Sequence, residues 1–251
     1  MFFFQDFYGK QVLKSSILQG LEHLFTTRDF ILTSGELSEL NDEAALNRKF
    51  LCEKLNLPIK KLITVKQTHS CNIEIYDGET SHYDNCDSVI SNVEDTGMIL
   101  NFADCVPIIL YSPDKNIASI VHAGWRGTSE KIVKKTITKL ISTYNIKRKH
   151  IKAAIGPSIG NCCFNVEEDV FNKLITDKEK QRSAWRLSKE KNKYDIDLKE
   201  LNRNQLLATG IIDIDVCDYC TSCMSDIFFS YRKERGKTAR HSAIVKLEKR
   251  K

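Results

Sequence analysis

The stretch from residue 117 to residue 128 reads Ile-Ala-Ser-Ile-Val-His-Ala-Gly-Trp-Arg-Gly-Thr. Its first five residues are small or apolar, which predicts a strand buried inside the molecule. The strand leads directly into His122 and a turn with two glycines, and an amphipathic helix is expected after Gly127. A strand, a turn and a helix in this order favour a mixed α and β fold. They also place His122 and Arg126 at a strand end, where scaffolds tend to present functional groups.

The rest of the chain continues this alternation of apolar strands and amphipathic helices. This alternation indicates a mixed α and β domain, and neither a repeat nor a linker is visible. A polar stretch over 177–204 is expected to contain an exposed connection. The expected helices cover 42–55, the segment from about Val166, 197–210, and the segment after Gly127, with Thr128 or Ser129 as its N-cap. The expected strands are Lys61–Val65, Ile73–Tyr76, Ser88–Ile90, Met98–Phe102, Pro107–Tyr111, Ile117–Val121, Ile151–Ile155, Ile211–Val216 and Ile244–Leu247.

Composition excludes several classes of protein. The chain has 251 residues, of which 41% are hydrophobic and 28% charged, so it is neither disordered nor too short for a core. A net charge of +5 is too small to indicate a nucleic-acid partner. No window approaches the ~20 apolar residues of a membrane span, so no membrane partner is expected. Nine cysteines, several of them in short runs, favour a cytoplasmic protein with reduced thiols and no structural disulfides. We expect this protein to be a monomer or a small homo-oligomer.

Three polar side chains follow apolar strands at turn-like positions. They are His69, Cys105 and His122. Two imidazoles and one thiolate form a complete catalytic zinc set, which leaves a fourth position for water or substrate. The same three donors also suit copper. The residues alone leave open a packed cysteine with two ordinary polar histidines.

Two further clusters have more than one interpretation. Cys217, Cys220 and Cys223 have the spacing of an iron–sulfur run but lack its fourth cysteine. Cys162 and Cys163 would complete a four-thiolate zinc site only if the fold brought them close, so we expect ordinary thiols near a strand end. A basic cluster near the C-terminus is either a solvated face or a phosphate contact. It comprises Arg232, Arg235, Lys237, Arg240 and His241.

Several motifs in this order resemble one known family. They are Gln-Thr-His-Ser at 67–70, Ala-Asp-Cys at 103–105, Val-His-Ala-Gly-Trp-Arg-Gly at 121–127 and Ile-Gly-Pro-Ser-Ile-Gly at 155–160. Together they resemble the YfiH-like or laccase-domain family, first labelled polyphenol oxidases and then described as purine nucleoside-processing enzymes. The resemblance implies one α+β domain of the YfiH-like fold over 1–251, with mixed β-sheets flanked by helices. For the activity, it implies phosphorolysis of adenosine, inosine, guanosine and methylthioadenosine, with adenosine deamination. It also implies Zn²⁺, or copper, held by His69, Cys105 and His122, and purine nucleosides and phosphate as partners.

The resemblance also implies further site residues. Beside the three metal ligands, Asp87 and Arg126 are expected to be catalytic. Either Asp87 or Asp104 would relay protons, and arginines including Arg126 would orient phosphate. Arg48, Gly156 and Arg240 are expected to bind substrate. The chain departs from the family at Arg28–Gly35, at Phe164-Asn165-Val166, where a Tyr-Glu-Val is usual, and at Ala239, where a glycine is usual. We expect these changes to affect substrate preference.

Three other functions remain open at this point. A copper-dependent polyphenol oxidase would use the same three ligands, but a laccase needs a further histidine-rich copper cluster, and only His23, His82, His150 and His241 remain for it. A cysteine-dependent amide hydrolase acting on cell-wall precursors would use Cys105 as its nucleophile. A binding module without catalysis rests only on the net charge and the basic C-terminal tail.

Overall fold

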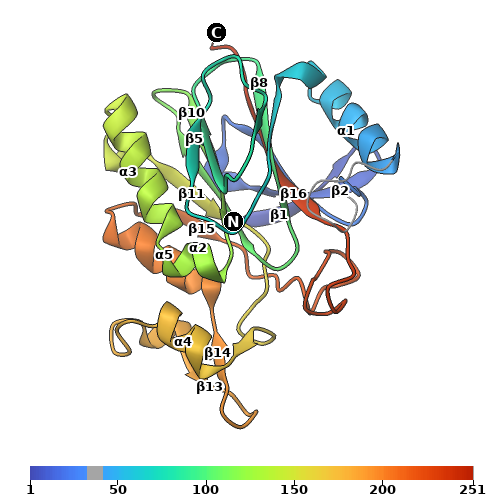
Figure 1. The fold of residues 1–251 in the computed structure, drawn as a ribbon. Coiled ribbons are helices and arrows are strands. Elements are labelled where there is room, and N and C mark those ends of the chain that lie inside the picture. Colours follow the sequence, from blue (N-terminus) through green and yellow to red (C-terminus); the bar gives the residue numbers. More distant parts are fainter. Residues whose placement is uncertain (33–41, 251) are drawn as a thin grey trace.

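The computed structural model describes residues 1–32 and 42–250, and two large sheets dominate it (Figure 1). The seven-stranded sheet has the spatial order β1 (Phe2–Phe7), β2 (Lys10–Ser15), β3 (Glu22–Thr26), β16 (His241–Leu247), β8 (Thr96–Phe102), β4 (Leu62–Val65) and β6 (His82–Tyr83). The six-stranded sheet has the order β15 (Asp213–Val216), β11 (Lys152–Ile155), β9 (Val106–Ser112), β10 (Ile117–Ala123), β7 (Ser88–Ser91) and β5 (Ile73–Ile75). A small sheet has the order β12 (Asn165–Val166), β14 (Tyr194–Ile196) and β13 (Trp185–Leu187).

Helices cover the outer faces of the two large sheets. Those of the described ranges are α1 (Asp42–Lys54), α2 (Trp125–Ser129), α3 (Ile132–Tyr144), α4 (Glu168–Leu174) and α5 (Leu198–Ala208). In Figure 1, α3 and α5 lie beside the six-stranded sheet, and α1 lies on the far side of the seven-stranded sheet. The main body therefore has four layers, helix, sheet, sheet and helix, with a hydrophobic core between each pair of neighbours.

The central strands are apolar throughout because both of their faces are covered. In β8, Met98 and Leu100 pack between the sheets, whereas Ile99 points toward α1. In β9, Ile109 packs between the sheets, whereas Ile108 points toward α3 and α5. Successive side chains of a strand point to opposite faces, so a strand buried on both sides shows no polar alternation. Continuous apolar runs were therefore the right signal for these strands.

The predicted fold class is confirmed. All nine expected strands are present, and the sheets mix parallel pairs such as β11 with β15 and antiparallel pairs such as β9 with β10. That residues 1–251 make up a single domain stays a prediction. No helix in the described ranges is long and apolar enough to cross a membrane.

The N-terminal strands β1, β2 and β3 are absent from the sequence-based prediction. Phe2 and Phe4 are half-buried against the core between the sheets, while Phe3 and Gln5 are exposed. The β1–β2 hairpin turns at Tyr8 and Gly9, whose φ angles are 53° and 83°. Two successive residues with positive φ are typical of the type I′ turns that favour hairpins. In the sequence, the Tyr8-Gly9 pair is the feature that could have indicated this hairpin. The short apolar run over 1–4 does not indicate it alone.

One helix boundary was wrong, and another helix starts two residues after the expected position. Thr128 and Ser129 do not cap the amphipathic helix, because they lie inside the short helix α2. Lys131 then adopts a left-handed conformation, with φ of 63°, and α3 begins after it. Val166 belongs to β12 rather than to a helix, and α4 follows it with Glu167 as its N-cap residue.

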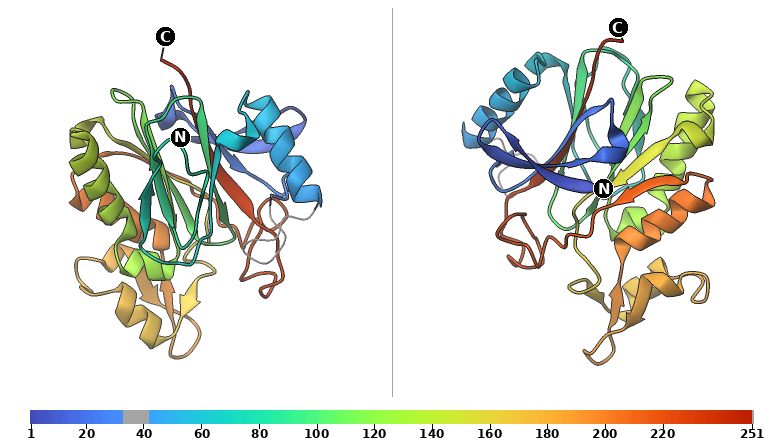
Figure 2. Two further views of the ribbon diagram at one scale, coloured as in Figure 1. Left: turned by 45° about the horizontal axis from the view of Figure 1, so that its top comes forward. Right: turned by 180° about the vertical axis from the view of Figure 1, so that it is seen from behind.

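The predicted helix over 197–210 is confirmed in detail. The Asp197 side chain accepts a hydrogen bond from the backbone N–H of Glu200, and Gly210 ends the segment with φ of 84°. The polar stretch before it forms the exposed strand β13 and the loop to β14. Figure 2 shows α4 and the small sheet as a projection below the main body. This projection contributes one wall of the cavity described next.

Candidate metal centre

The three predicted metal ligands meet where the two large sheets come together. His69 follows β4 of the seven-stranded sheet, and His122 lies near the end of β10 in the six-stranded sheet. Cys105 lies in the connection by which the chain passes from β8 in one sheet to β9 in the other. One imidazole nitrogen of each histidine and the Cys105 Sγ all lie within 4.8 Å of one another. The fold thus brings together a candidate metal site from residues up to 53 positions apart.

Asp87 forms hydrogen bonds that position two of the candidate ligands, His69 and His122. It is fully buried immediately before β7, and its carboxylate accepts a hydrogen bond of 2.7 Å from His122 Nδ1. The same carboxylate accepts the backbone N–H groups of Thr68, His69 and Ser70, at 3.2, 3.1 and 2.7 Å. Burial opposes ionisation, but the hydrogen bonds from His122 and Ser70 lower the pKa of Asp87 to about 2. Asp87 therefore fixes the loop of one ligand and the ring of another.

The donor set fits a metal ion. Since His122 Nδ1 bonds to Asp87, its other ring nitrogen remains for a ligand, and such a carboxylate partner is usual behind metal-binding histidines. Burial opposes ionisation of the Cys105 thiol, but His122 and His69 outweigh it and lower the pKa of Cys105 to about 6. A thiolate is the form that binds metal. A Cβ at Gly124 would lie 3.0 Å from Cys105 Sγ and 3.1 Å from His69 Cδ2, so only glycine leaves the ligands in place.

The backbone beside two ligands is held in an unusual conformation. His69 has φ of 60°, and Asp104, next to Cys105, has φ of 83°. Residues other than glycine rarely adopt such angles, and each instance costs on the order of 1–3 kcal/mol. The Asp104 carboxylate accepts hydrogen bonds of 2.7 Å from Thr221 Oγ1 and from the Arg232 backbone N–H. These bonds hold the turn that presents Cys105.

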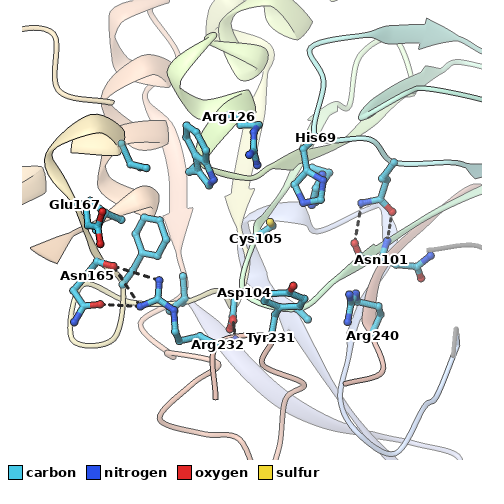
Figure 3. Close-up of a pocket in the computed structure, with 18 of the residues that line it drawn as sticks. His69, Asn101, Asp104, Cys105, Arg126, Asn165, Glu167, Tyr231, Arg232 and Arg240 are labelled. Carbon is cyan, nitrogen blue, oxygen red and sulfur yellow. Dashed lines mark hydrogen bonds between the residues drawn. The ribbon is translucent and has the colours of Figure 1, made fainter. Parts of the chain in front are cut away.

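The candidate ligands line a cavity of about 730 Å³. Figure 3 shows the side chains of His69, Arg126, Tyr231 and Arg240 around Cys105. Besides the metal ligands, the described lining includes three aromatic rings, three carboxyl groups and three guanidinium groups. They are Trp125, Phe164 and Tyr231; Asp104, Glu167 and Asp169; and Arg126, Arg232 and Arg240.

The three arginines of the cavity differ in how they are held. Arg232 donates to the Asn165 side chain at 2.9 Å and to the Cys163 carbonyl at 3.0 Å. Arg240 donates to two backbone carbonyls, at 2.8 and 3.0 Å. Arg126 is exposed, and its guanidinium group lies over the Trp125 ring, 4.3 Å from the centroid, without a hydrogen bond or ion pair to any described residue. Among the three, Arg126 is thus the arginine with all of its guanidinium donors available.

Two of the predicted substrate-binding residues are not among the described lining residues. Arg48 lies in α1, where its Nε donates to the Leu32 carbonyl at 3.1 Å. Gly156 permits close packing, because a Cβ there would lie 2.3 Å from the Phe25 ring and 2.9 Å from Pro107. A substrate contact for either residue stays a prediction. The atypical loop over 28–35 ends at residues that lie outside the described ranges.

The basic cluster near the C-terminus divides into two parts. Arg232 and Arg240 line the cavity, whereas Arg235 and Lys237 do not. His241 is buried in β16, and burial lowers its pKa to about 3, so it carries no charge at neutral pH. Only the two arginines of the predicted cluster are therefore placed for a phosphate contact.

Several cavity residues were missed by reasoning from the sequence. Gln67 accepts from the Asn101 backbone N–H and donates to its carbonyl, both at 2.8 Å, which joins the His69 loop to β8. Trp125 and Tyr231 were visible within recognised motifs, since each stands next to an arginine that was singled out. Glu167 was assigned only to a helix start, although it lines the cavity. Its position beside Asn165 supplies a carboxylate close to where the family motif usually has one.

A family model described as multi-copper polyphenol oxidoreductase laccase matches residues 23–248. The match includes all three candidate ligands and nearly every strand of the two sheets. The chain belongs to this family. Membership in the laccase-like family agrees with the order of motifs around His69, Cys105 and His122, and it confirms the resemblance noted from the sequence.

Named relatives of this laccase-like chain process purine nucleosides. A protein of Geobacillus stearothermophilus named purine nucleoside phosphorylase YlmD is 34% identical over 212 residues, covering 79% of this chain and 77% of its own. A protein named adenosine deaminase RL5, from an unknown prokaryotic organism, is 27% identical over 236 residues, covering 86% and 90%. The crystal structure of the hypothetical protein YfiH from Bacillus licheniformis superimposes with a TM-score of 0.86 at 29% identity, covering 94% and 96%. The YfiH-like fold is thereby confirmed.

Proposed function

We propose that this chain is a zinc-dependent purine nucleoside phosphorylase acting on inosine, adenosine, guanosine and methylthioadenosine. One observation carries the proposal: the cavity that contains the three candidate ligands also contains Arg126, whose donors are available for an anion. The name of the relative that is 34% identical supports the same chemistry. We expect the activity in the cytoplasm, where thiols such as Cys105 stay reduced.

The cavity has the size and lining that a nucleoside needs. Sites for small molecules usually enclose about 300–1,000 Å³ and combine apolar walls with a few polar groups. The rings of Trp125, Phe164 and Tyr231 offer apolar faces on which a purine can stack. Asp104, Glu167 and Asp169 provide acceptors for ribose hydroxyls and for base N–H groups. A purine nucleoside therefore satisfies both the apolar and the polar lining.

Arg126 is the residue that we assign to phosphate. In phosphorolysis the glycosidic C–N bond breaks, a C–O bond to phosphate forms, and the purine leaves with a proton. A guanidinium group binds phosphate in a bidentate manner and holds its oxygen against the sugar carbon. Stacking on Trp125 orients the Arg126 guanidinium toward the cavity without occupying its donors. Arg232 and Arg240 add positive charge from the opposite wall.

Zinc is the metal that the ligand set favours. Two imidazoles and one thiolate leave one position open, as catalytic zinc sites require. When bound, zinc would supply Lewis-acid stabilisation of charge that develops on the substrate. The other four histidines, His23, His82, His150 and His241, join no second cluster of metal ligands within the described ranges. This arrangement supports zinc over the several copper ions of a laccase, which need further imidazoles.

The purified chain is expected to convert inosine and phosphate into hypoxanthine and ribose 1-phosphate. Chromatography of the products, with and without phosphate, measures this reaction, and elemental analysis measures zinc. If hypoxanthine forms equally fast without phosphate, the chain hydrolyses inosine, and the proposal of phosphorolysis is contradicted. Oxygen-dependent oxidation of a phenol by the copper-loaded chain, with no nucleoside turnover, would favour the oxidase instead.

Adenosine deamination is a second activity that we propose for the same cavity, because one relative is named an adenosine deaminase. Inosine formed from adenosine in the absence of phosphate would support it. The close pairing of Cys105 with His122 also suits a cysteine nucleophile. Activity that survives chelation but is abolished by alkylation of Cys105 would favour the amide hydrolase over the zinc enzyme.

Replacing Arg126 with alanine is expected to raise KM for phosphate about tenfold and to change KM for inosine much less. The reason is that one charge-assisted hydrogen-bonding group is worth about 1.5–3 kcal/mol, and Arg126 faces phosphate rather than the base. Steady-state kinetics with each substrate varied in turn checks this. Arg182→Ala is the matched control, since Arg182 also stacks on a tryptophan, Trp185, at 4.8 Å, but lies outside the cavity. An equal increase in KM for both substrates would contradict the assignment.

A further inference from the structure

Four cysteines outside the cavity meet at one point. Cys162 and Cys163 follow β11, and Cys220 and Cys223 follow β15. Because β11 and β15 are neighbouring parallel strands, their ends lie at the same edge of the sheet. An isolated bridge between Ser158 and Cys220 extends this pairing beyond the strands. The four Sγ atoms all lie within 4.8 Å of one another. The fold therefore brings Cys162 and Cys163 close enough to Cys220 and Cys223 for a four-thiolate site.

The distances suit one metal ion better than a disulfide. Cys223 Sγ lies 3.5 Å from both Cys162 Sγ and Cys163 Sγ. In a tetrahedral site with metal–sulfur bonds of about 2.3 Å, the sulfur atoms are about 3.8 Å apart. A disulfide requires about 2.05 Å, and Cys223 could bond to only one of its two neighbours. A single tetrahedral ion uses all four thiolates at close to their present separations.

A backbone donor favours a thiolate at Cys220. The Gly160 backbone N–H donates to Cys220 Sγ at 3.2 Å, an arrangement that stabilises negative charge on sulfur. A Cβ at Gly160 would lie 3.2 Å from Cys220 Cβ and 3.3 Å from Cys162 Sγ, so the backbone approaches the sulfur atoms closely. Glycine therefore both permits this approach and supplies a donor.

A buried cation beside the cluster gives an independent indication. Lys199 is only 6% exposed and lines the same small cavity as Cys162 and Cys220. Its Nζ donates to the carbonyl groups of Cys217 and Tyr219, at 2.6 and 3.1 Å, and forms no ion pair with a carboxylate in the described ranges. A buried ammonium group is stabilised by negative charge nearby. Four thiolates around a divalent ion carry a net charge of −2, which would add to that of the carboxylates of Asp197, Glu200 and Asp218 lining the same cavity.

From these observations we propose that Cys162, Cys163, Cys220 and Cys223 bind one Zn²⁺ ion in a structural site, separate from the metal centre of the cavity. Four protein ligands leave no open position, which is the mark of a structural rather than a catalytic zinc site. Tetrahedral coordination by sulfur alone selects zinc or iron, and zinc needs no redox partner.

The ion would join two loops that form walls of the catalytic cavity. The loop with Cys163 continues into Asn165, and the loop with Cys220 continues toward Arg232. Arg232 already donates to the Cys163 carbonyl and to Asn165, so the two loops are in contact. Thr221, beside Cys220, donates to Asp104. The zinc site thus cross-links the segments that hold Arg232, Asn165 and Asp104 in position.

The first test separates the two metal sites. The His122→Ala chain, purified under reducing conditions, is expected to retain one zinc per chain by elemental analysis. X-ray absorption at the zinc edge should show four sulfur ligands at about 2.3 Å. Absence of stoichiometric metal in this variant, or iron in place of zinc, would overturn the proposal. Because the measurement counts metal and ligands, it does not depend on nucleoside turnover.

The second test changes the cysteines themselves. The Cys162→Ser/Cys223→Ser chain is expected to lose one zinc equivalent and to unfold at a temperature lower by about 5 °C or more. Cys217→Ala is the matched control, because Cys217 shares the Cys-x-x-Cys spacing but lies outside the cluster. It should keep its zinc. Retention of the full zinc content by the double variant would overturn the proposal.

A third measurement uses the unaltered chain, so it does not require the variants to fold. Cys162 and Cys223 are exposed, so as free thiols both are accessible to iodoacetamide. We expect both to resist alkylation until a chelator removes zinc, as read by peptide mass spectrometry. Immediate alkylation of both residues, or a disulfide at Cys223, would overturn the proposal.

Discussion

Replacing His122 with alanine is expected to lower kcat/KM for inosine phosphorolysis by about 10³-fold or more and to remove the cavity metal. Loss of a partner behind a metal ligand typically costs 10–100-fold, and loss of the ligand itself should cost more. Two ligands, His69 and Cys105, would remain, and a catalytic zinc site needs three. The measurements are steady-state kinetics with inosine and phosphate, and metal analysis of the purified chain.

The His122→Ala chain should still fold, which keeps this result interpretable. Without the imidazole, the Asp87 carboxylate still accepts the backbone N–H groups of Thr68, His69 and Ser70. Circular dichroism checks the fold. His82→Ala is the control for removal of a histidine, because His82 is exposed on β6 and contacts Thr64 rather than the cavity. An unchanged rate with the cavity metal still bound would exclude His122 from the metal site.

The ligand triad could be predicted from the sequence because each member follows a strongly apolar strand. His69, Cys105 and His122 interrupt patterns in which a buried strand would carry another apolar residue. The central strands were equally visible, since both of their faces are buried and the runs are continuous. In both cases the signal is local, and it depends on burial of the strand itself.

Other features depend on contacts between distant segments and could not be predicted in this way. Nothing in the sequence around Cys162 shows that β11 and β15 are neighbours, so the four-thiol cluster was interpreted as ordinary cysteines. Arg126, Arg232 and Arg240 look alike in the sequence, yet their hydrogen bonds show that Arg126 alone among these three keeps all of its guanidinium donors available. In the small sheet of β12, β13 and β14, β13 is mostly exposed and β14 is half-buried, so their residues lack a marked pattern.

Asp87 shows how a residue's role depends on its place in the fold. The resemblance implied a catalytic carboxylate that relays protons, but Asp87 is fully buried and is absent from the described cavity lining. Its carboxylate bonds to the backbone of 68–70 and to His122 Nδ1. We infer that Asp87 acts through the metal ligands as a positioning residue.

Replacing Asp87 with asparagine is accordingly expected to weaken metal binding and to lower kcat/KM about 10–100-fold. Asparagine keeps the shape but replaces one acceptor oxygen with an NH₂ donor. If that donor faces His122, the imidazole must accept at Nδ1, so its proton moves to the nitrogen that would bind metal. If it faces Ser70 instead, it meets N–H and hydroxyl donors, and the loop of His69 shifts. Either orientation damages one of the two histidine ligands.

The measurement that separates positioning from general destabilisation is zinc affinity, determined by competition with a chelator at a temperature where the variant remains folded. Loss of the buried acceptor should also lower the free energy of unfolding by about 1–3 kcal/mol. Asp77→Asn is the matched control, because Asp77 likewise accepts backbone N–H groups of its own loop, from Glu79 and Thr80, but is exposed and outside the cavity. That variant should keep both zinc affinity and rate. If Asp87→Asn unfolds more easily yet binds zinc and turns over inosine as the unaltered chain does, Asp87 supports the fold alone. The neighbouring rings of His69 and Phe102, with centroids 4.9 and 5.3 Å from that of His122, would then be enough to orient His122.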